Sequence, residues 1–413
     1  MTSAASRLRV VVSGYIGLLP AGGVAWDYAQ YVLALRALGH DARYIEDTRL
    51  WPVYGARGTT APDCSATVRS LAEVMRGFGL EDEWAYRDEI TGAWFGADAS
   101  AVSGWIAGAD VLLNVSCATP VRDAYLDIPV RVMIDSDPMF TQIQCHQAEG
   151  FTPGDNGMRA AMAVHTHHFT FGERVGAADC RMPETGVDWR PTRQPICLDR
   201  WTAPPPDAVD GRSLTTVMNW SAGRPLNFDG ETWGQKDVEF LKVLDLPRRC
   251  PEVSFSVAIG QTGGADFPAE RLRAAGWRVL DPSRVASSVG DYRDFIMRSL
   301  GECSVAKQTY VKARTGWFSC RSACYLAAGR PVITQDTGWS HVLPSGEGLL
   351  AFDDIAGAAD AVDRLLSDPV RHGRRAREIA DACFDGRKVI GRLLADVDGT
   401  RPTVAGVPRR SHD

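Results

Sequence analysis

The residues best suited to bind a phosphate group stand together at one predicted helix start. Residues 315–338 read TGWFSCRSACYLAAGRPVITQDTG, which combines a polar turn, a helix-like run, a Gly-x-Pro break and a β-branched strand. Ser319, Arg321 and Ser322 occupy the predicted helix start, where hydroxyl groups and free backbone N–H groups favour an anion. We therefore predict that these three residues contact a phosphate.

A second polar turn closes the same segment. Val332–Thr334 is predicted to be a buried strand, and Asp336, Thr337 and Gly338 come shortly after it. Ligands of open α/β sheets bind outside the carboxyl ends of the strands, so a carboxylate in this turn can bind sugar hydroxyls. The two turns together offer the phosphate ligands and the sugar ligand that a nucleotide-sugar requires.

Other loops offer further phosphate ligands. Paired glycines at a helix start let a ligand approach the backbone, and an arginine can hold a diphosphate through two parallel hydrogen bonds. Gln235–Lys236 opens another predicted helix and would add positive charge. On these grounds five more residues are predicted to bind the phosphates: Gly22, Gly23, Ser221, Arg224 and Lys307.

Three residues are candidates for the catalytic groups. Asp27 lies in the first turn of the first long helix, where it can be a base or a partner of the helix dipole. Asp137 follows the apolar strand Val130–Ile134 and can be a base, an acceptor ligand or a helix cap. His167 is one of three histidines within residues 165–168, and a neutral imidazole suits general base catalysis near pH 7, although a core histidine is the alternative.

The elements that must position these residues alternate between strand and helix in both halves of the chain. This alternation predicts parallel sheets with right-handed crossovers. A proline-rich stretch at residues 201–206 separates the halves. We predict two Rossmann-like, doubly wound α/β domains that face each other across a cleft, at residues 1–205 and 206–385. Residues 386–413 are predicted to form a helix that crosses back to the first domain, and a flexible tail.

Composition and charge narrow the class of protein. The chain has 413 residues and a net charge of −6, which argues against nucleic acid as its partner. It has no signal-peptide pattern, and no apolar run reaches the roughly 18 residues that a membrane span needs. We therefore expect no membrane partner. Its ten cysteines contain no CxxC pair, so we expect a cytoplasmic protein with reduced thiols and no metal site. The sequence leaves a homodimer open.

Two motifs resemble those of the GT-B class of nucleotide-sugar glycosyltransferases. Leu35–Asp41 reads LRALGHD at the end of the first long helix, and Ala327–Ile333 reads AAGRPVI, similar to the A-x-G-x-P-V element of the donor domain. The resemblance implies that the second domain binds the nucleotide diphosphate and the first domain the acceptor. It further implies that no metal or cofactor is needed, because helix dipoles and side chains neutralise the leaving diphosphate.

The chain also departs from this family. Cys324 stands where many members have a glutamate that binds the ribose, and the histidine that many inverting members place after the first strand is missing. Asp27 lies in that region and is the remaining candidate base. The stereochemistry and the nucleotide base therefore stay open, with UDP and TDP as the first candidates.

The leading hypothesis is transfer of a sugar from a nucleotide diphosphate to a small-molecule acceptor. Aromatic side chains suit such an acceptor, although they can equally fill the core: Trp26, Tyr28, Trp51 and Tyr54. A GT-B-like epimerase or phosphorylase and a non-catalytic nucleotide-sugar binding protein are the alternatives. A dinucleotide enzyme is disfavoured, because the GxGxxG pattern is absent.

Overall fold

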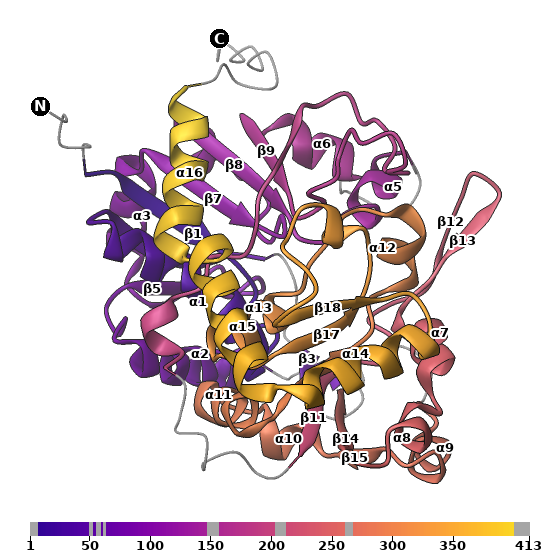
Figure 1. The fold of residues 1–413 in the computed structure, drawn as a ribbon. Coiled ribbons are helices and arrows are strands. Elements are labelled where there is room, and N and C mark those ends of the chain that lie inside the picture. Colours follow the sequence, from indigo (N-terminus) through magenta and orange to yellow (C-terminus); the bar gives the residue numbers. More distant parts are fainter. Residues whose placement is uncertain are drawn as a thin grey trace, which may run out of the picture.

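Two β-sheets form the frame of the molecule (Figure 1). The computed structural model describes residues 7–48, 53–54, 59–60, 63–146, 157–202, 212–260 and 267–399. Each sheet collects the strands of one half of the chain and is flanked by the helices that connect them. The predicted plan of two doubly wound Rossmann-like domains is therefore confirmed. The predicted boundary at residues 205–206 lies outside the described residues.

The first sheet has the order β10-β9-β8-β7-β1-β2-β5-β6, and all its neighbours are parallel except β5 and β6. Its strands are β1 (Arg9–Ser13), β2 (Asp41–Glu46), β5 (Trp84–Arg87), β6 (Trp94–Gly96), β7 (Val111–Val115), β8 (Val130–Asp135), β9 (His167–Thr170) and β10 (Trp189–Pro191). Its helices are α1 (Gly22–Ala37), α2 (Ser65–Phe78), α3 (Ala99–Gly108), α4 (Asp123–Leu126), α5 (Phe140–His146) and α6 (Gly157–Ala163).

The second sheet is parallel throughout, in the order β15-β14-β11-β16-β17-β18. Its strands are β11 (Ser213–Asn219), β14 (Ser254–Gly260), β15 (Arg278–Leu280), β16 (Gly301–Ser304), β17 (Val332–Gln335) and β18 (Leu349–Phe352). Its helices are α7 (Lys236–Phe240), α8 (Leu246–Arg249), α9 (Ala269–Ala274), α10 (Pro282–Val285), α11 (Val289–Arg298), α12 (Gln308–Ala313), α13 (Cys320–Ala327), α14 (Ile355–Ser367) and α15 (Pro369–Cys383).

The strand order reverses once in each sheet. In the first sheet the chain runs outward from β1 to β2 and β5, then returns to the other side of β1 with β7. In the second sheet β11 has the same role, with β14 on one side and β16 on the other. Such a reversal opens a crevice at the carboxyl ends of the strands, which is where doubly wound folds bind ligands.

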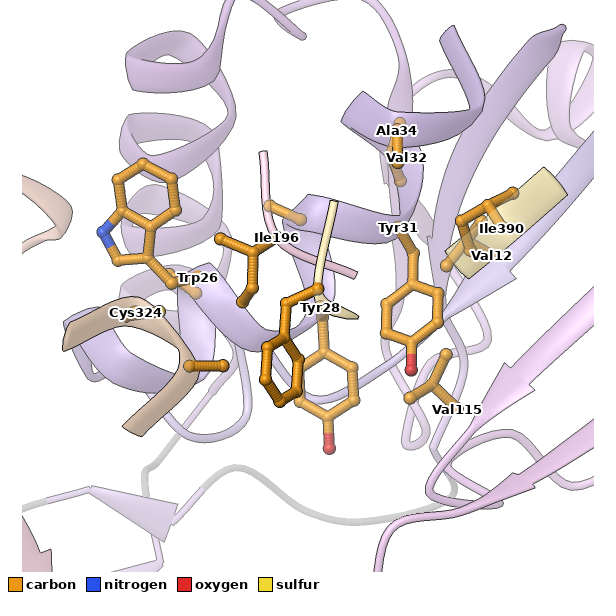
Figure 2. Close-up of a cluster of buried hydrophobic side chains, with 14 of the residues drawn as sticks. Val12, Trp26, Tyr28, Tyr31, Val32, Ala34, Val115, Ile196, Cys324 and Ile390 are labelled. Carbon is orange, nitrogen blue, oxygen red and sulfur yellow. The ribbon is translucent and has the colours of Figure 1, made fainter. Parts of the chain in front are cut away.

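One apolar core joins both halves of the molecule (Figure 2). It includes Val12 of β1, Trp26 of α1 and Cys324 of α13, which are all 2% exposed or less. The last helix, α16 (Gly386–Asp398), contributes Ile390 and lies against α1. A Cβ atom on Gly386 would lie 2.9 Å from Cβ of Ala34 in α1, so this glycine allows the close approach of the two helices.

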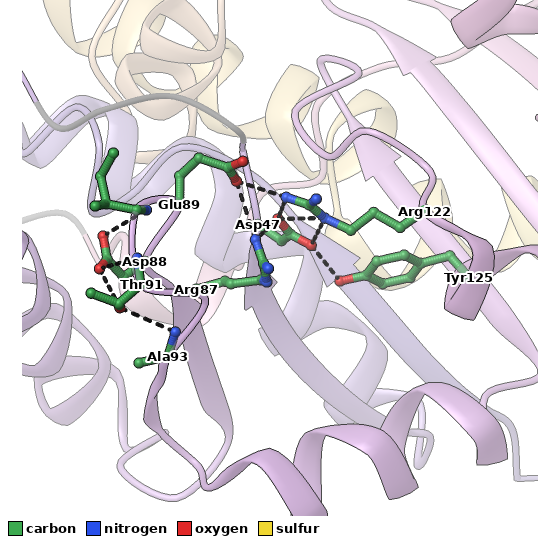
Figure 3. A network of polar contacts seen from close by, with 9 residues as sticks. Asp47, Arg87, Asp88, Glu89, Thr91, Ala93, Arg122 and Tyr125 are labelled. Atoms are coloured by element: carbon green, nitrogen blue, oxygen red, sulfur yellow. Dashed lines mark hydrogen bonds and ion pairs between the residues drawn. The ribbon is translucent and has the colours of Figure 1, made fainter.

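A buried ion-pair network fixes the carboxyl edge of the first sheet (Figure 3). Arg122, just before α4, donates from Nε to Asp47 Oδ2 at 2.8 Å and from Nη2 to Glu89 Oε2 at 2.7 Å. Asp47 follows β2 and is only 1% exposed. The guanidinium therefore ties the ends of β2 and β5 to the start of α4.

Candidate functional site

A cavity of about 630 Å³ lies between the two sheets, at the carboxyl ends of their strands. Its first-domain wall comes from the loops after β1, β7 and β8, and from α5. Its second-domain wall comes from the loops after β11 and β16, and from Gln235 before α7. Both strand-order reversals thus open into the same space, which is large enough for a nucleotide-sugar or an acceptor.

The first-domain wall is largely aromatic and apolar. Its members include Tyr15, Leu19, Tyr28, Met133, Phe140 and Met158. Tyr28 donates from its hydroxyl to Ser116 Oγ at 3.0 Å, and Ser116 Oγ lies 2.7 Å from Ser136 Oγ. Ser116 and Cys117 hold the left-handed φ angles 59° and 50°, a strained conformation that is often found at ligand sites. This hydroxyl chain positions the loops after β7 and β8 around the cavity.

Asp137 is the carboxylate of the loop after β8 that faces the cavity. Its Oδ1 accepts hydrogen bonds from Lys307 Nζ at 2.6 Å and from the Tyr310 hydroxyl, so it links the two domains. Its neighbour Asp135 is buried and accepts hydrogen bonds from Thr141, Gln142 and Thr170. Asp135 therefore maintains the loop structure, whereas Asp137 is half exposed and available to a ligand.

The second-domain wall presents cations. Arg224 is exposed on the cavity wall, and it forms no ion pair within the described residues. Lys307 lines the same wall and is paired with Asp137. Ser221 is buried and donates to the Gly223 carbonyl at 2.8 Å, so its hydroxyl shapes the loop and is not free for a phosphate. The predicted phosphate role thus suits Arg224 and Lys307 better than Ser221.

Lys236 is a further candidate anion ligand, which was not among the predicted phosphate ligands although its charge was expected to contribute. It opens α7 beside the cavity-lining Gln235, and no ion pair or hydrogen bond of its ammonium group is found within the described residues. Burial, together with the positive charges of Arg321 and Lys307, lowers the pKa of Lys236 well below its usual value. A buried ammonium group without a counter-charge favours binding of an anion.

Arg321 does not fit the predicted phosphate role. It is buried, donates from Nε to Glu302 Oε1 at 2.5 Å, and donates from Nη1 to the Val217 carbonyl at 2.8 Å. Its charge is already neutralised by Glu302. Ser319 is the N-cap of α13 without a side-chain capping bond, and Ser322 Oγ is buried with no hydrogen-bond partner. The helix start, rather than its arginine, therefore remains the candidate anion ligand.

The paired glycines also have a different role from the predicted one. The Gly22 N–H donates to the Ala286 carbonyl at 2.8 Å, so it is not available to a phosphate. A Cβ atom on Gly22 would lie 2.2 Å from the Ser288 carbonyl oxygen, and one on Gly23 would lie 3.0 Å from the ring of Tyr292. These residues lack side chains because α1 packs closely against the segment that leads into α11.

The predicted sugar-binding turn is occupied by internal contacts. Asp336 Oδ1 accepts from the Gly338 N–H at 2.8 Å, and its Oδ2 accepts from the Ser340 hydroxyl at 2.6 Å. Thr337 is buried and donates to the Trp317 carbonyl at 2.6 Å. Gly338, at φ 92°, packs against Arg174 of the first domain. None of the three lines the cavity, so the structure gives this turn a role in folding and in the domain contact.

Asp27 lies beside the site but does not line the cavity. Its carboxylate contacts the Cys320 thiol at the start of α13, and its Oδ1 is buried without a hydrogen-bond partner. Burial is the main cause that raises the pKa of Asp27 to about 6, and the charge of Asp137 adds to it. The group could exchange a proton near neutral pH.

The structure does not bring His167 to the cavity. His167 pairs with Val132 near the amino end of β9, whereas the cavity lies beyond the carboxyl ends of the strands. Its Nδ1 lies 2.9 Å from Thr166 Oγ1, and the residue is buried. The strand register therefore makes His167 a core histidine.

Of the four aromatic candidates for the acceptor pocket, only Tyr28 is found in the cavity wall. Trp26 is 2% exposed, stacks near Trp201 and donates from Nε1 to the Val289 carbonyl at 3.0 Å. It belongs to the core between the domains. Trp51 and the side chain of Tyr54 lie outside the described residues.

Solved structures of glycosyltransferases share this architecture at very low sequence identity. The HepE protein of Anabaena, in complex with UDP and glucose, matches with a TM-score of 0.54 and 9% identity over 95% of this chain and 100% of that one. AviGT4, a glycosyltransferase of avilamycin A biosynthesis, matches with a TM-score of 0.51 and 11% identity over 95% of this chain and 97% of that one. An α-glucosyltransferase in complex with UDP and a DNA 13-mer matches with a TM-score of 0.56 and 10% identity over 94% of this chain and 99% of that one. The chain has the GT-B fold.

No model of a protein family and no curated protein sequence matches the chain. The GT-B fold nevertheless explains the position of Cys324 in the middle of α13. Cys324 is fully buried in the core that joins the domains, so an apolar thiol packs where many members of this class place a polar ribose ligand.

Two searches of the described residues gave negative results. No cluster of three or more histidine, cysteine, aspartate or glutamate side chains that could hold a metal ion occurs in this part of the chain. Among the described helices, none is both long enough and apolar enough to cross a membrane.

Proposed function

We propose that this GT-B protein is a cytoplasmic glycosyltransferase that moves a sugar from a nucleotide diphosphate to a small-molecule acceptor. The observation that carries the proposal is the cavity of about 630 Å³ with a cationic wall on one domain and an aromatic wall on the other. A donor diphosphate suits the first wall and an uncharged organic acceptor suits the second. Nucleic acid and membranes are not partners in this proposal.

The donor diphosphate would lie on the second domain. Arg224 and Lys307 line that side of the cavity, Lys236 follows the lining residue Gln235, and the start of α13 carries the positive end of a helix dipole. These groups can stabilise the charge that develops on the leaving diphosphate, so the proposed reaction needs neither a metal nor a cofactor. UDP is the first candidate, because HepE and the α-glucosyltransferase bind UDP.

The acceptor would lie against Tyr15, Tyr28 and Phe140 of the first domain. Asp137 reaches the same space and can accept the proton of an acceptor hydroxyl as the bond between the sugar and the diphosphate breaks. Asp27, with its raised pKa and its position behind the cavity wall, is the second candidate for this role. Substituting each by asparagine would distinguish them, because only the loss of the base should lower kcat by orders of magnitude and leave donor affinity intact.

Calorimetry with UDP, TDP, GDP and ADP on the purified protein is the first test. We expect one nucleotide to bind clearly more tightly than the others, and the Arg224→Ala variant to bind it more weakly. Incubation with the matching nucleotide-sugar and a set of phenolic and polyol acceptors should then yield a glycoside and free nucleotide diphosphate. Failure of all four nucleotides to bind would refute the proposal.

The same assay separates the alternative functions. An epimerase would change the sugar of the nucleotide-sugar without any acceptor, and a phosphorylase would require inorganic phosphate for turnover. A non-catalytic binding protein would bind the nucleotide-sugar and release no product with any acceptor.

A further inference from the structure

A second cavity, of about 510 Å³, lies at the opposite edge of the second sheet. It is formed by the amino-terminal parts of β11 and β14, by β15, and by α10 and α11 (Figure 1). The catalytic cavity begins beyond the carboxyl end of β11. Thr215 of the second cavity lies four residues before Asn219 at the carboxyl end of β11, so roughly 13 Å of strand separates the two cavities. A ligand here could not reach the reacting groups.

The floor of this second cavity is a row of hydroxyl groups. Thr215 of β11 pairs in register with Ser256 of β14, and Ser256 pairs with Arg278 of β15. Thr215, Ser256 and nearby Ser299 are 6% exposed or less. The other face of the same strands is apolar, with Leu214, Phe255 and Val257 in the core of this domain. Parallel sheets usually bury apolar residues on both faces, so a hydroxyl-bearing face is unusual.

The rim of this cavity carries an excess of positive charge. Arg278, Arg284 and Arg298 all line it and are exposed. Within the part of the chain that the structure describes, none of these three guanidinium groups forms an ion pair or a hydrogen bond with a side chain. The two aspartates of the rim have partners elsewhere: Asp291 accepts from Ser287 and Ser288, and Asp294 lies 3.8 Å from Arg293.

We propose that this second cavity binds a small phosphorylated polyhydroxy compound, such as a sugar phosphate, at a site separate from the catalytic cavity. Three guanidinium groups that line one cavity suit a phosphate dianion, which each can bind through paired N–H donors. The rim carboxylates suit the hydroxyl groups of the same ligand, whereas the floor hydroxyls of Thr215, Ser256 and Ser299 are held by hydrogen bonds to one another and to Ser213 and Tyr325. The volume of about 510 Å³ accommodates such a molecule.

The position of α11 gives such a ligand a route to the domain interface. Arg298 and Asp291 of α11 line the second cavity. The amino end of the same helix contacts α1 of the first domain, where the Trp26 indole donates to the Val289 carbonyl at 3.0 Å. A ligand that restrains α11 would therefore alter the contact between the domains, so the site would regulate activity and not take part in it.

Calorimetry on the full chain tests the proposal with glucose 6-phosphate, inorganic phosphate and glucose as probes. Glucose 6-phosphate should bind, inorganic phosphate should bind more weakly, and glucose should not bind measurably. The double variant Arg278→Ala/Arg298→Ala should weaken binding by about tenfold or more, because each substitution removes a charged hydrogen-bond donor. Both arginines are exposed, so the variant is expected to fold, and its far-ultraviolet circular dichroism verifies this.

Two control variants locate the binding. Arg271→Ala removes an exposed arginine of α9 outside the cavity and should leave binding unchanged. Lys236→Ala alters the catalytic cavity and should also leave it unchanged. The proposal is overturned if neither phosphate probe binds at millimolar concentration, or if the double variant binds as the wild type does. Loss of binding in Lys236→Ala alone would overturn it too, because the probe would then occupy the catalytic cavity.

Discussion

Replacing Lys236 by methionine removes a partly buried cation beside the first cavity that has no counter-charge in the described structure. Arg224 is also without an ion pair among the described residues, but it is exposed to water. The charge of Arg321 is neutralised by Glu302 at 2.5 Å, and that of Lys307 by Asp137 at 2.6 Å. The ammonium group of Lys236 is therefore the one with most to gain from a bound diphosphate. Methionine keeps much of the apolar length of the side chain and removes the charge together with the N–H donors of the ammonium group.

A hydrogen bond to a charged group contributes about 1.5–3 kcal/mol, which corresponds to a loss of roughly ten- to hundredfold or more in affinity. We expect UDP to bind Lys236→Met more weakly by this factor in calorimetry near pH 7. Lys242→Met is the matched control, because Lys242 lies in the same segment, is exposed and pairs with Glu239. Equal UDP affinity in Lys236→Met and wild type, or an equal loss in the control, would refute the reasoning.

The pKa of Lys236 supplies a second readout. Burial lowers this pKa in the free protein, whereas a bound diphosphate would favour the charged ammonium and raise it again. At pH values above its lowered pKa in the free protein, UDP binding should therefore take up protons, which appears as a difference in binding enthalpy between two buffers of unlike ionisation enthalpy. The Lys236→Met variant should lose this proton uptake.

The same group affects stability in the absence of ligand. Between its lowered folded pKa and its ordinary unfolded pKa, the unfolded chain binds a proton that the folded chain does not. The free energy of unfolding should therefore rise with pH in this window, and Lys236→Met should lack that rise. Between these two pKa values the variant should be more stable than the wild type, because folding no longer requires Lys236 to lose its proton and its hydration.

Three other substitutions test the structural roles assigned above. Gly22→Ala should destabilise the protein by about 1–3 kcal/mol in denaturant unfolding, because its Cβ would overlap the Ser288 carbonyl at 2.2 Å. Gly39→Ala at the end of α1 is the control: its Cβ meets no neighbouring atom, so this variant measures only the strain of an alanine at a φ of 89°. Asp27→Asn should abolish a fall in unfolding free energy between about pH 4 and 6, because the folded chain holds the Asp27 proton up to its pKa of about 6 while the unfolded chain releases it earlier. Arg122→Ala should lower the free energy of unfolding by about 3–5 kcal/mol, because it leaves the Asp47 carboxylate buried beside a weaker partner, Arg87 at 4.0 Å. A decrease below about 1 kcal/mol would show that the network contributes little to stability.

The strands were predictable because their residues carry a local signal. Val111–Val115 and Leu349–Phe352 are apolar runs bounded by polar turns, and the structure places β7 and β18 at those residues. The loops after such strands were expected to gather in a cleft, and those after β1, β8, β11 and β16 do so. Helix α2 and the short hairpin β12 (Leu226–Phe228) with β13 (Glu231–Trp233) were not predicted.

The site residues were harder to predict, because their roles depend on partners far away in the sequence. Arg321 looks like a phosphate ligand until its ion pair with Glu302, nineteen residues earlier, is known. Gly22 looks like part of an anion loop until α11, more than 260 residues later, is seen against it. Asp336 carried a local signal, since an aspartate two residues before a glycine often caps its own turn.

The bond between Asp137 and Lys307 has a kinetic consequence for the proposed reaction. In the free protein the carboxylate and the ammonium group neutralise each other across the cleft. A donor diphosphate would compete with Asp137 for the ammonium group, and the released carboxylate would then be free to accept the proton of the acceptor. The substrates would then add in a compulsory order, donor first, and the acceptor would show no productive binding to the empty enzyme.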